Sequence, residues 1–142
     1  MSVAVRTKAF LLAVIPLILC TFAVSQSKPE AVAQQSSTAW LALVDSGKYD
    51  QSWDEAADYF KHAVSKAQWQ GMLQSTRTPL GKLISRKLKA ATYTKSLPGA
   101  PDGEYVVIQY DSGFEHKDAA VETVVPMLDK DGTWRVSGYF IK

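Results

Sequence analysis

The spacing of apolar residues changes from helical to strand-like part-way along the chain. After residue 36, apolar residues recur three and four positions apart, which is typical of helices that bury one face. The pattern predicts three helices, beginning near Ser37, Ser52 and Ser65. From Leu83 onward, β-branched and aromatic residues dominate short runs separated by turns, which is typical of strands.

Turn and capping residues set the expected ends of the helices. Gly47 should end the first helix in a left-handed conformation. The serine-to-glutamate spacing of Ser52 and Glu55 predicts a capping box at the start of the second helix. The same spacing of Ser65 and Gln68 predicts one at the start of the third.

Four strands are expected in the second half of the chain. They are predicted at Leu83–Thr94, Tyr105–Tyr110, Ala119–Leu128 and Thr133–Ile141. Turns rich in proline, glycine and aspartate separate them at 97–103 and 129–132. Pro126 predicts an edge position or a bulge. Alternation along the last strand predicts one buried face, formed by Trp134, Val136, Gly138 and Phe140.

Helices followed by antiparallel strands predict an α+β domain. About three helices should pack on one face of a curved antiparallel sheet of four strands. This single domain is expected to span residues 36–142, preceded by a polar, flexible tether over residues 26–35.

The first 25 residues have the pattern of a removable export signal. Arg6 and Lys8 precede an apolar run, and small residues follow it, which predicts cleavage between Ser25 and Gln26. Three alternatives stay open: later cleavage after residues 31–33, an uncleaved membrane anchor, and a lipoprotein with lipid on Cys20. The predicted location is the periplasm or the exterior of a bacterium, without stable membrane insertion after cleavage.

Composition limits the chemistry of the mature chain. Cys20 is the only cysteine, so cleavage after residue 25 leaves neither disulfides nor thiol chemistry. The formal net charge of the whole chain is +2, and two of its basic residues lie in the signal. The mature chain is therefore close to neutral, which argues against a general nucleic-acid binder.

Charges are nonetheless segregated along the mature chain. No acidic residue lies between Asp58 and Asp102, whereas eight acidic residues lie from Asp102 to Asp131. The basic residues of the first stretch are Lys61, Lys66, Arg77, Lys82, Arg86, Lys87, Lys89 and Lys95. This arrangement fits a basic strand beside an acidic one, or a basic patch that attracts an anionic ligand.

Arginine and glutamate supply the main candidate site residues, with Arg77 among them. Strand alternation places Arg86 on the face of Ile84 and Leu88, which predicts an inward side chain. A buried arginine needs a carboxylate or an anionic ligand, and Glu122 is the expected internal partner. Both an Arg86–Glu122 ion pair and an anion-binding Arg86 stay open.

Aromatic residues and histidines add little further chemistry. Trp53 and Tyr110 complete the candidate ligand site, because aromatic side chains can line the cleft that helices leave on a concave sheet. His62 and His116 lack partners at metal-ligand spacing and are expected at the surface. We find no metal motif, no cofactor motif and no nucleophile motif, and so no catalytic residue is assigned.

Several short segments of the mature chain form a pattern that extends over about residues 36–142. They are Trp40–Asp45, Ser52–Trp53, Ala56–Ala57, Arg77, Pro79–Gly81, Arg86, Leu97–Gly99, Asp102–Tyr105, Glu122 and Gly132–Tyr139. Through these segments the chain resembles the family called domain of unknown function 4019, a group of mostly small exported bacterial proteins. The predicted architecture is also similar to the cone-like folds of cystatin and nuclear transport factor two. Such folds carry both enzymes and simple binding proteins.

Three classes of function remain. We expect a non-enzymatic exported module that binds an unidentified small molecule or an envelope protein. The first alternative is an enzyme that abstracts a proton in a cone-shaped pocket, with Glu122 as the base and Arg86 as electrostatic stabiliser. The second is a structural partner in an envelope assembly.

Overall fold

The computed structural model describes residues 27–142. The predicted signal peptide and its Ser25–Gln26 cleavage site lie outside these residues. The helices are α1 (Pro29–Asp45), α2 (Tyr49–Asp54), α3 (Asp58–Ala63) and α4 (Lys66–Thr76), followed by a short 3-10 turn, η1 (Thr78–Leu80). The strands are β1 (Leu83–Thr94), β2 (Tyr105–Phe114), β3 (Lys117–Leu128) and β4 (Trp134–Ile141).

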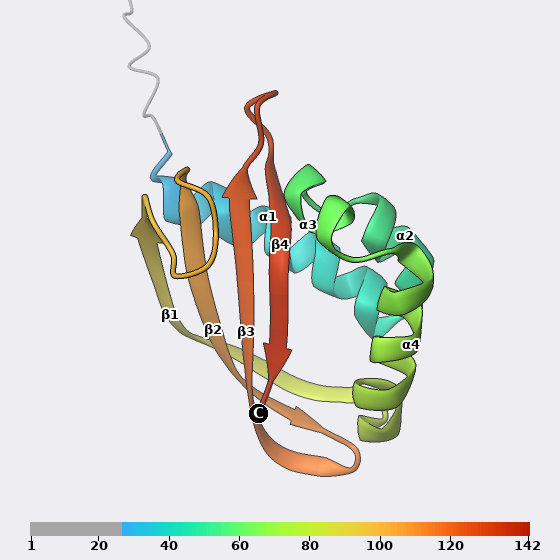
Figure 1. The fold of residues 1–142 in the computed structure, drawn as a ribbon. Coiled ribbons are helices and arrows are strands. Elements are labelled where there is room, and N and C mark those ends of the chain that lie inside the picture. Colours follow the sequence, from blue (N-terminus) through green and yellow to red (C-terminus); the bar gives the residue numbers. More distant parts are fainter. Residues whose placement is uncertain (1–26) are drawn as a thin grey trace, which may run out of the picture.

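The fold is an α+β arrangement, as the sequence predicts. The four strands form one antiparallel sheet in the order β1-β2-β3-β4, and each pairs with the strand that follows it in the chain. The sheet is curved, α1 crosses behind it, and α2 to α4 lie beside β4 (Figure 1). No helix in the described part of the chain is long and apolar enough to span a membrane.

The core lies between the helices and the concave face of the sheet. Trp40 and Leu41 of α1 and Trp69 of α4 are almost completely buried. The Trp40 and Trp69 rings pack with centroids 5.9 Å apart. The helices cover apolar residues at the middle of the sheet, among them Ile108 and Val124. Each such side chain stabilises the fold by about 1.5–3 kcal/mol through its burial.

The first helix begins earlier than predicted. It starts at Pro29, so residues 29–35 are helical and the predicted tether over residues 26–35 is wrong for that part. Proline fits the first turn of a helix because its missing N–H has no partner there. The buried Ala33 then extends the apolar face of the helix toward the N-terminus. The other side of this segment is polar, which concealed the helix from a search for apolar periodicity.

The second helix also begins earlier, and a fourth helix is present. The helix α2 starts at Tyr49, so the predicted capping box of Ser52 and Glu55 does not form. Ser52 is instead buried, and its hydroxyl accepts a hydrogen bond from the Trp69 indole at 2.9 Å. The box of Ser65 and Gln68 is present at the start of α4, as predicted.

A bulge changes the buried face of β4. Val125 pairs with Gly138 and Pro126 pairs with Val136, so Ser137 is an extra residue in β4. Trp134 and Val136 are buried as predicted, whereas the prediction for Gly138 and Phe140 is wrong, because the extra residue reverses the alternation. Tyr139 therefore faces the core, and Phe140 is 60% exposed. The prediction of an edge or a bulge at Pro126 is confirmed as a bulge.

Candidate functional site

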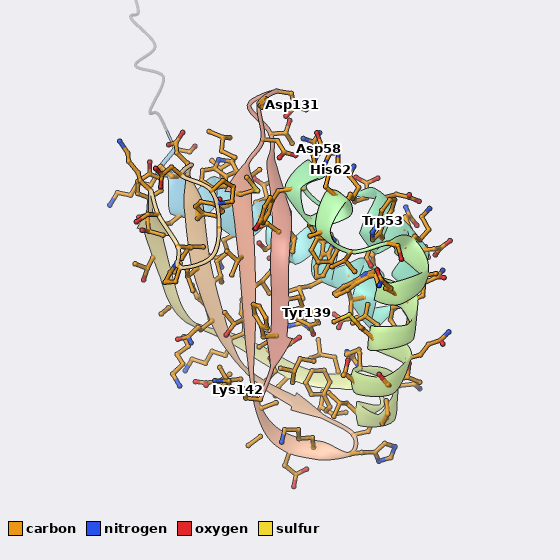
Figure 2. All side chains as sticks on the ribbon, viewed as in Figure 1. Trp53, Asp58, His62, Asp131, Tyr139 and Lys142 are labelled. Atoms are coloured by element: carbon orange, nitrogen blue, oxygen red, sulfur yellow. The ribbon has the colours of Figure 1, made fainter. Side chains whose placement is uncertain are left out.

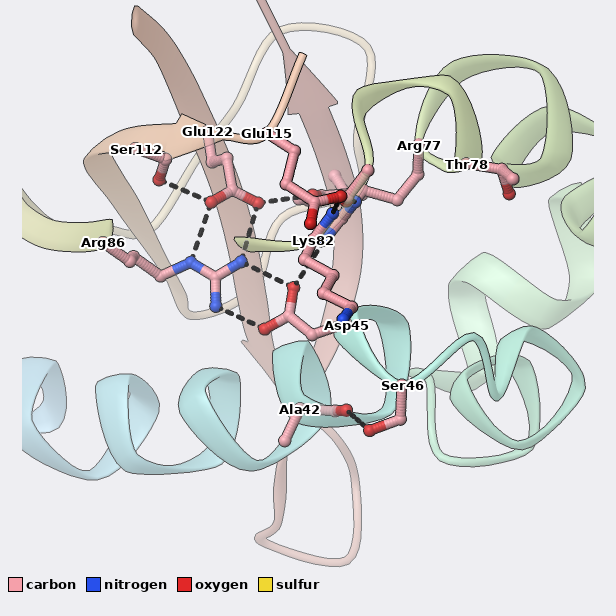
Figure 3. A network of polar contacts seen from close by, with 12 residues as sticks. Ala42, Asp45, Ser46, Arg77, Thr78, Lys82, Arg86, Ser112, Glu115 and Glu122 are labelled. Carbon is pink, nitrogen blue, oxygen red and sulfur yellow. Dashed lines mark hydrogen bonds and ion pairs between the residues drawn. The ribbon is translucent and has the colours of Figure 1, made fainter. Parts of the chain in front are cut away.

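Four charged side chains meet beneath the helices at one end of the sheet. Asp45 ends α1, Arg77 follows α4, Arg86 lies in β1 and Glu122 lies in β3. We call these four residues the charge centre (Figure 3). Two are positive and two are negative, so their formal charges cancel.

Arg86 connects the two carboxylates of the charge centre. Its Nε and Nη2 donate to the two oxygens of Glu122 at 2.8 and 3.0 Å. Its Nη1 and Nη2 donate to the two oxygens of Asp45 at 2.7 and 3.0 Å. The planar guanidinium thus forms a two-bond pair with each carboxylate (Figure 3). Arg86 joins the last turn of α1 to the edge of the sheet.

Glu122 is completely buried, and both of its oxygens are fully engaged. The Oε1 atom accepts from Arg86 and from the hydroxyl of Ser112. The Oε2 atom accepts from Arg86 and from the hydroxyl of Tyr139, which the bulge in β4 turns inward. Each oxygen therefore accepts two hydrogen bonds, so no lone pair remains for a proton from a substrate.

Asp45 lies where a carboxylate is unfavourable, because the C-terminus of a helix carries partial negative charge. Two arginines offset this: Arg86, and Arg77 with its Nη2 3.2 Å from Asp45 Oδ1. Gly47 ends the helix at φ +70°, and the amide of Lys48 returns to the carbonyl of Leu43 at 2.9 Å. The prediction of a left-handed Gly47 is confirmed.

Arg77 has internal contacts as well. Its Nη1 donates to the carbonyl of Gly81 at 2.6 Å, and its guanidinium lies 4.4 Å from the centre of the Phe114 ring. The residue is 3% exposed. Arg77 thus holds the turn after α4 against α1 and β2 rather than pointing to solvent.

Two pKa shifts express the electrostatics of the charge centre. Burial alone lowers the pKa of the Arg86 guanidinium, but hydrogen bonds and the negative charges of Asp45 and Glu122 more than offset this, and the pKa is raised. The pKa of Tyr139 is also raised, first by burial and then by the adjacent Glu122 carboxylate. Arg86 stays charged and Tyr139 stays neutral over the whole physiological range.

The structure confirms the predicted Arg86–Glu122 ion pair and corrects its surroundings. Arg86 points inward, yet Ile84 and Leu88, which were expected to share its buried face, are 69% and 41% exposed. Asp45 was not among the predicted site residues. Its only sequence signal is a carboxylate in the last turn of a helix, where basic residues are usual.

The aromatic candidates lie apart from one another. The Trp53 indole donates to the carbonyl of Val64 at 2.7 Å, and its label lies among the helices in Figure 2, away from the end of the sheet. Tyr110 is paired with Glu122 across β2 and β3 and is 4% exposed. Burial raises the pKa of its phenol. Only Tyr110 therefore belongs to the surroundings of the charge centre.

Open grooves are present at the surface, and the one of about 550 Å³ is lined by Ser112, whose hydroxyl donates to Glu122. Five grooves have volumes of about 550, 390, 380, 430 and 290 Å³. None of the five has Asp45, Arg77, Arg86 or Glu122 in its lining. Tyr139 forms part of the floor of the smallest, between α4 and β4.

The segregated charges are only partly matched across strands. The pair between Lys89 of β1 and Asp111 of β2, at 3.4 Å, is the one ion pair that joins these strands within residues 27–142. His62 and His116 are exposed as predicted. Among residues 27–142 there is no cluster of three or more His, Cys, Asp or Glu side chains that could hold a metal ion.

A comparison with protein families shows to which family the chain is related. The profile described as "Protein of unknown function (DUF4019)" matches residues 36–139. The chain belongs to the DUF4019 family. A comparison with curated protein sequences found no match.

The matched range of the DUF4019 chain contains the whole charge centre, the strands β1 to β3 and all of β4 except its last two residues. It begins within α1, so the first turns of that helix lie before it. The description of the family assigns no activity.

Proposed function

We propose that this DUF4019 protein is an exported, non-enzymatic module that binds another protein through its outer surface. The observation that carries the proposal is that Arg86 and Glu122 have all their hydrogen-bonding groups engaged by protein atoms, and that Arg77 Nε is the one buried side-chain atom of the charge centre without a partner. An anionic ligand would need a free arginine, but both arginines contact Asp45, and Arg86 also contacts Glu122. Such buried charges that satisfy one another stabilise or specify the fold rather than wait for a ligand.

The alternative of a proton-abstracting enzyme has less support. A general base needs a lone pair within hydrogen-bond reach of the substrate proton. Both oxygens of Glu122 accept two bonds from protein groups, and the side chain has no exposed area. The proposal for Glu122 is therefore a structural role, in which it holds β3 to β1 and β4.

The outer surface offers more for recognition than the interior does. Large apolar side chains remain exposed on both edge strands, with Ile84 and Leu88 on β1 and Phe140 on β4. Met72 of α4 is 52% exposed as well. Exposed apolar side chains with polar surroundings are common features of surfaces that bind proteins.

Export rests on the first 25 residues. Arg6 and Lys8, the apolar run after them and the small residues up to Ser25 have the order of a secretory signal. The proposed compartment is the periplasm or the exterior of a bacterium, where a partner would be an envelope or secreted protein.

The proposal is tested by cross-linking in the cells that produce the protein. We expect a complex with a second polypeptide, which is then purified and its binding measured directly. Tyr139→Phe, an interior change, should bind the purified partner as tightly as the wild type. Native mass spectrometry of the isolated protein should show no bound small molecule. A stoichiometric organic ligand, or no protein complex at all, would contradict the proposal.

A further inference from the structure

The strand β1 is an edge of the described sheet. Its 12 residues, Leu83–Thr94, pair with β2 on one side only. Figure 1 shows no described strand beside the outer side of the last part of β1, while α1 packs against this strand from behind. The backbone N–H and C=O groups on such an edge can pair with an additional strand.

Unpaired positive charge follows this edge. Lys82, Lys87 and Lys95 are exposed and form no ion pair with other residues of the described range. The Lys89–Asp111 pair is about half exposed at both side chains, so solvent and salt weaken it. The strand β1 contains no acidic residue, and Asp111 of β2, which lies opposite Lys87 and pairs with Lys89, offsets only part of this positive charge. The edge therefore favours an acidic partner.

Two aliphatic side chains lie among these lysines. Ile84 is 69% exposed and Leu88 is 41% exposed, and both belong to β1. The edge of β1 can bind an extended peptide through three kinds of contact. Its backbone groups can form hydrogen bonds, its aliphatic side chains can pack against apolar side chains, and its lysines can attract acidic ones. Main-chain bonds give affinity in this binding mode, and alternate side chains give specificity.

The same features disfavour a second copy of this chain. Pairing two β1 edges would bring lysines against lysines, which costs free energy. Lysines on an edge strand are a common device against its self-association. The register shifts between Leu83 and Ser85, and between Leu88 and Ala90, affect any added strand equally, so the charge alone distinguishes the two occupants. Charge complementarity thus selects an acidic segment of another protein.

We propose that β1 binds an extended segment of a partner protein that alternates acidic and apolar residues, added as a fifth strand of the sheet. This inference rests on the proposed protein-binding function and names the surface and the chemistry of the partner. The acidic side chains would lie beside Lys87 and Lys89, and an apolar side chain would contact Leu88.

The probe is a ten-residue peptide of alternating glutamate and valine, compared with its lysine–valine counterpart. Nuclear magnetic resonance at pH 7 and low salt measures amide shifts and hydrogen exchange in the mature domain. We expect saturable shifts centred on Leu83–Thr94 and slower exchange in β1. The acidic peptide should bind at least tenfold more tightly than the basic one, and added salt should weaken it.

Matched variants separate this surface from others. Lys87→Glu with Lys89→Glu should weaken binding of the acidic peptide at least tenfold. Lys130→Glu, in the exposed β3–β4 turn, also reverses a charge and should cause at most a small change. Leu88→Asp should weaken binding, whereas Met72→Asp, which is exposed on α4, should not. Both aspartate variants alter exposed positions, and circular dichroism checks their folding.

Several results would overturn the inference. They are an absence of binding, equal binding of the two peptides, shifts located away from β1, or dimerisation through β1 at micromolar concentration. The purified partner gives a separate check on this surface. If the complex forms in cells but persists in Lys87→Glu with Lys89→Glu, the edge is wrong and the proposed function stands. If no complex forms in cells, the proposed function fails too.

Discussion

Arg86 has more structural consequence than any other residue of the charge centre, because it neutralises two carboxylates. Arg86→Met leaves Asp45 and Glu122 close together without their common partner. We expect a loss of about 3–5 kcal/mol in the free energy of unfolding, as for other broken buried pairs. Glu122→Gln removes one negative charge and should cost less than Arg86→Met. Urea denaturation of the purified domain measures both losses.

The double variant distinguishes a coupled pair from independent residues. In the double variant with Arg86→Met and Glu122→Gln, part of the loss in the free energy of unfolding should be recovered. Both charges of the pair are then removed, so neither Arg86 nor Glu122 stays buried without its partner. Lys130→Met serves as the control, because Lys130 is exposed in the turn after β3. Small and additive losses at both interior sites would contradict the geometry of the charge centre.

The raised pKa of Tyr139 predicts that the folded protein loses stability in alkaline solution. Its pKa in the folded protein is raised above the ordinary value of 10.0, first by burial and then by Glu122. The folded state therefore holds this proton more tightly, so the contribution is complete below pH 10 and is lost as the pH rises further. Each such tyrosine adds a slope of about 1.4 kcal/mol per pH unit.

Tyr139→Phe isolates this effect from the other tyrosines. The variant should lose about 1–3 kcal/mol at pH 7, because Glu122 loses one hydrogen-bond donor. Above pH 10 its free energy of unfolding should fall less steeply than that of the wild type. Tyr59→Phe, at an exposed position, should leave the alkaline slope unchanged. Denaturant titrations from pH 7 to 11 test both statements, and equal slopes for wild type and Tyr139→Phe would refute this role.

The ion pair of Arg86 and Glu122 could be predicted from the sequence, whereas the contact of Arg86 with Asp45 could not. Strand alternation and the cost of a buried charge point from Arg86 to Glu122. Asp45 lies 41 residues from Arg86 in the chain and looks like an ordinary polar residue at the end of a helix. Only the packing of α1 on the sheet brings it into contact. Tyr139 was missed because one bulge residue changes which side chains face inward.

At the scale of elements, two glycines allow a matched test of helix ending. Gly47 has φ +70°, and a Cβ there would meet nothing within 4 Å, so an added side chain acts only through backbone strain. Gly47→Ala should cost about 1 kcal/mol. Gly71 lies inside α4, also with open space, and Gly71→Ala should add roughly 0.5–1 kcal/mol of stability.

Gly47→Ala should lower the free energy of unfolding and Gly71→Ala should raise it, so each variant serves as the control for the other. Thermal unfolding of the two variants under identical conditions gives the comparison. Stabilisation by Gly47→Ala would show that α1 does not end in the left-handed conformation that positions Asp45.

Strands were easier to predict than helix starts in this chain. The bounds of β1 match the expected range, and the predicted turns at 97–103 and 129–132 are present. The strands β2 and β3 extend beyond their predicted ends, to Phe114 and back to Lys117, and only two residues separate them. The starts of α1 and α2 were predicted too late. In α1 the apolar residues 31–33 are adjacent rather than three or four positions apart, and α2 begins with Tyr49 as the one large apolar residue before Ser52. Short helices such as α3 depend on tertiary contacts, including the hydrogen bond from the Ala57 amide to the Val136 carbonyl at 2.8 Å.

At the scale of the whole molecule, the predicted export signal implies which residue begins the mature protein. It also implies that reductant does not change the thermal stability of the mature protein. N-terminal sequencing of protein from its native compartment should give Gln26 as the first residue. Because Cys20 is the only cysteine, thermal unfolding of that protein should not change with reductant. Lipid on Cys20, or an intact Met1 in the membrane fraction, would show that the predicted processing is wrong.

The charge centre also has a kinetic consequence. Every strand pairs with its neighbour in the chain, so the sheet can form through contacts of short sequence separation. The contact between Asp45 and Arg86 instead closes a loop of 41 residues between α1 and the sheet. We expect the charge centre to assemble after the rate-limiting step of folding. Arg86→Met should then speed unfolding greatly and leave the refolding rate almost unchanged in stopped-flow measurements. The four charges would thus set how long the domain stays folded before it unfolds.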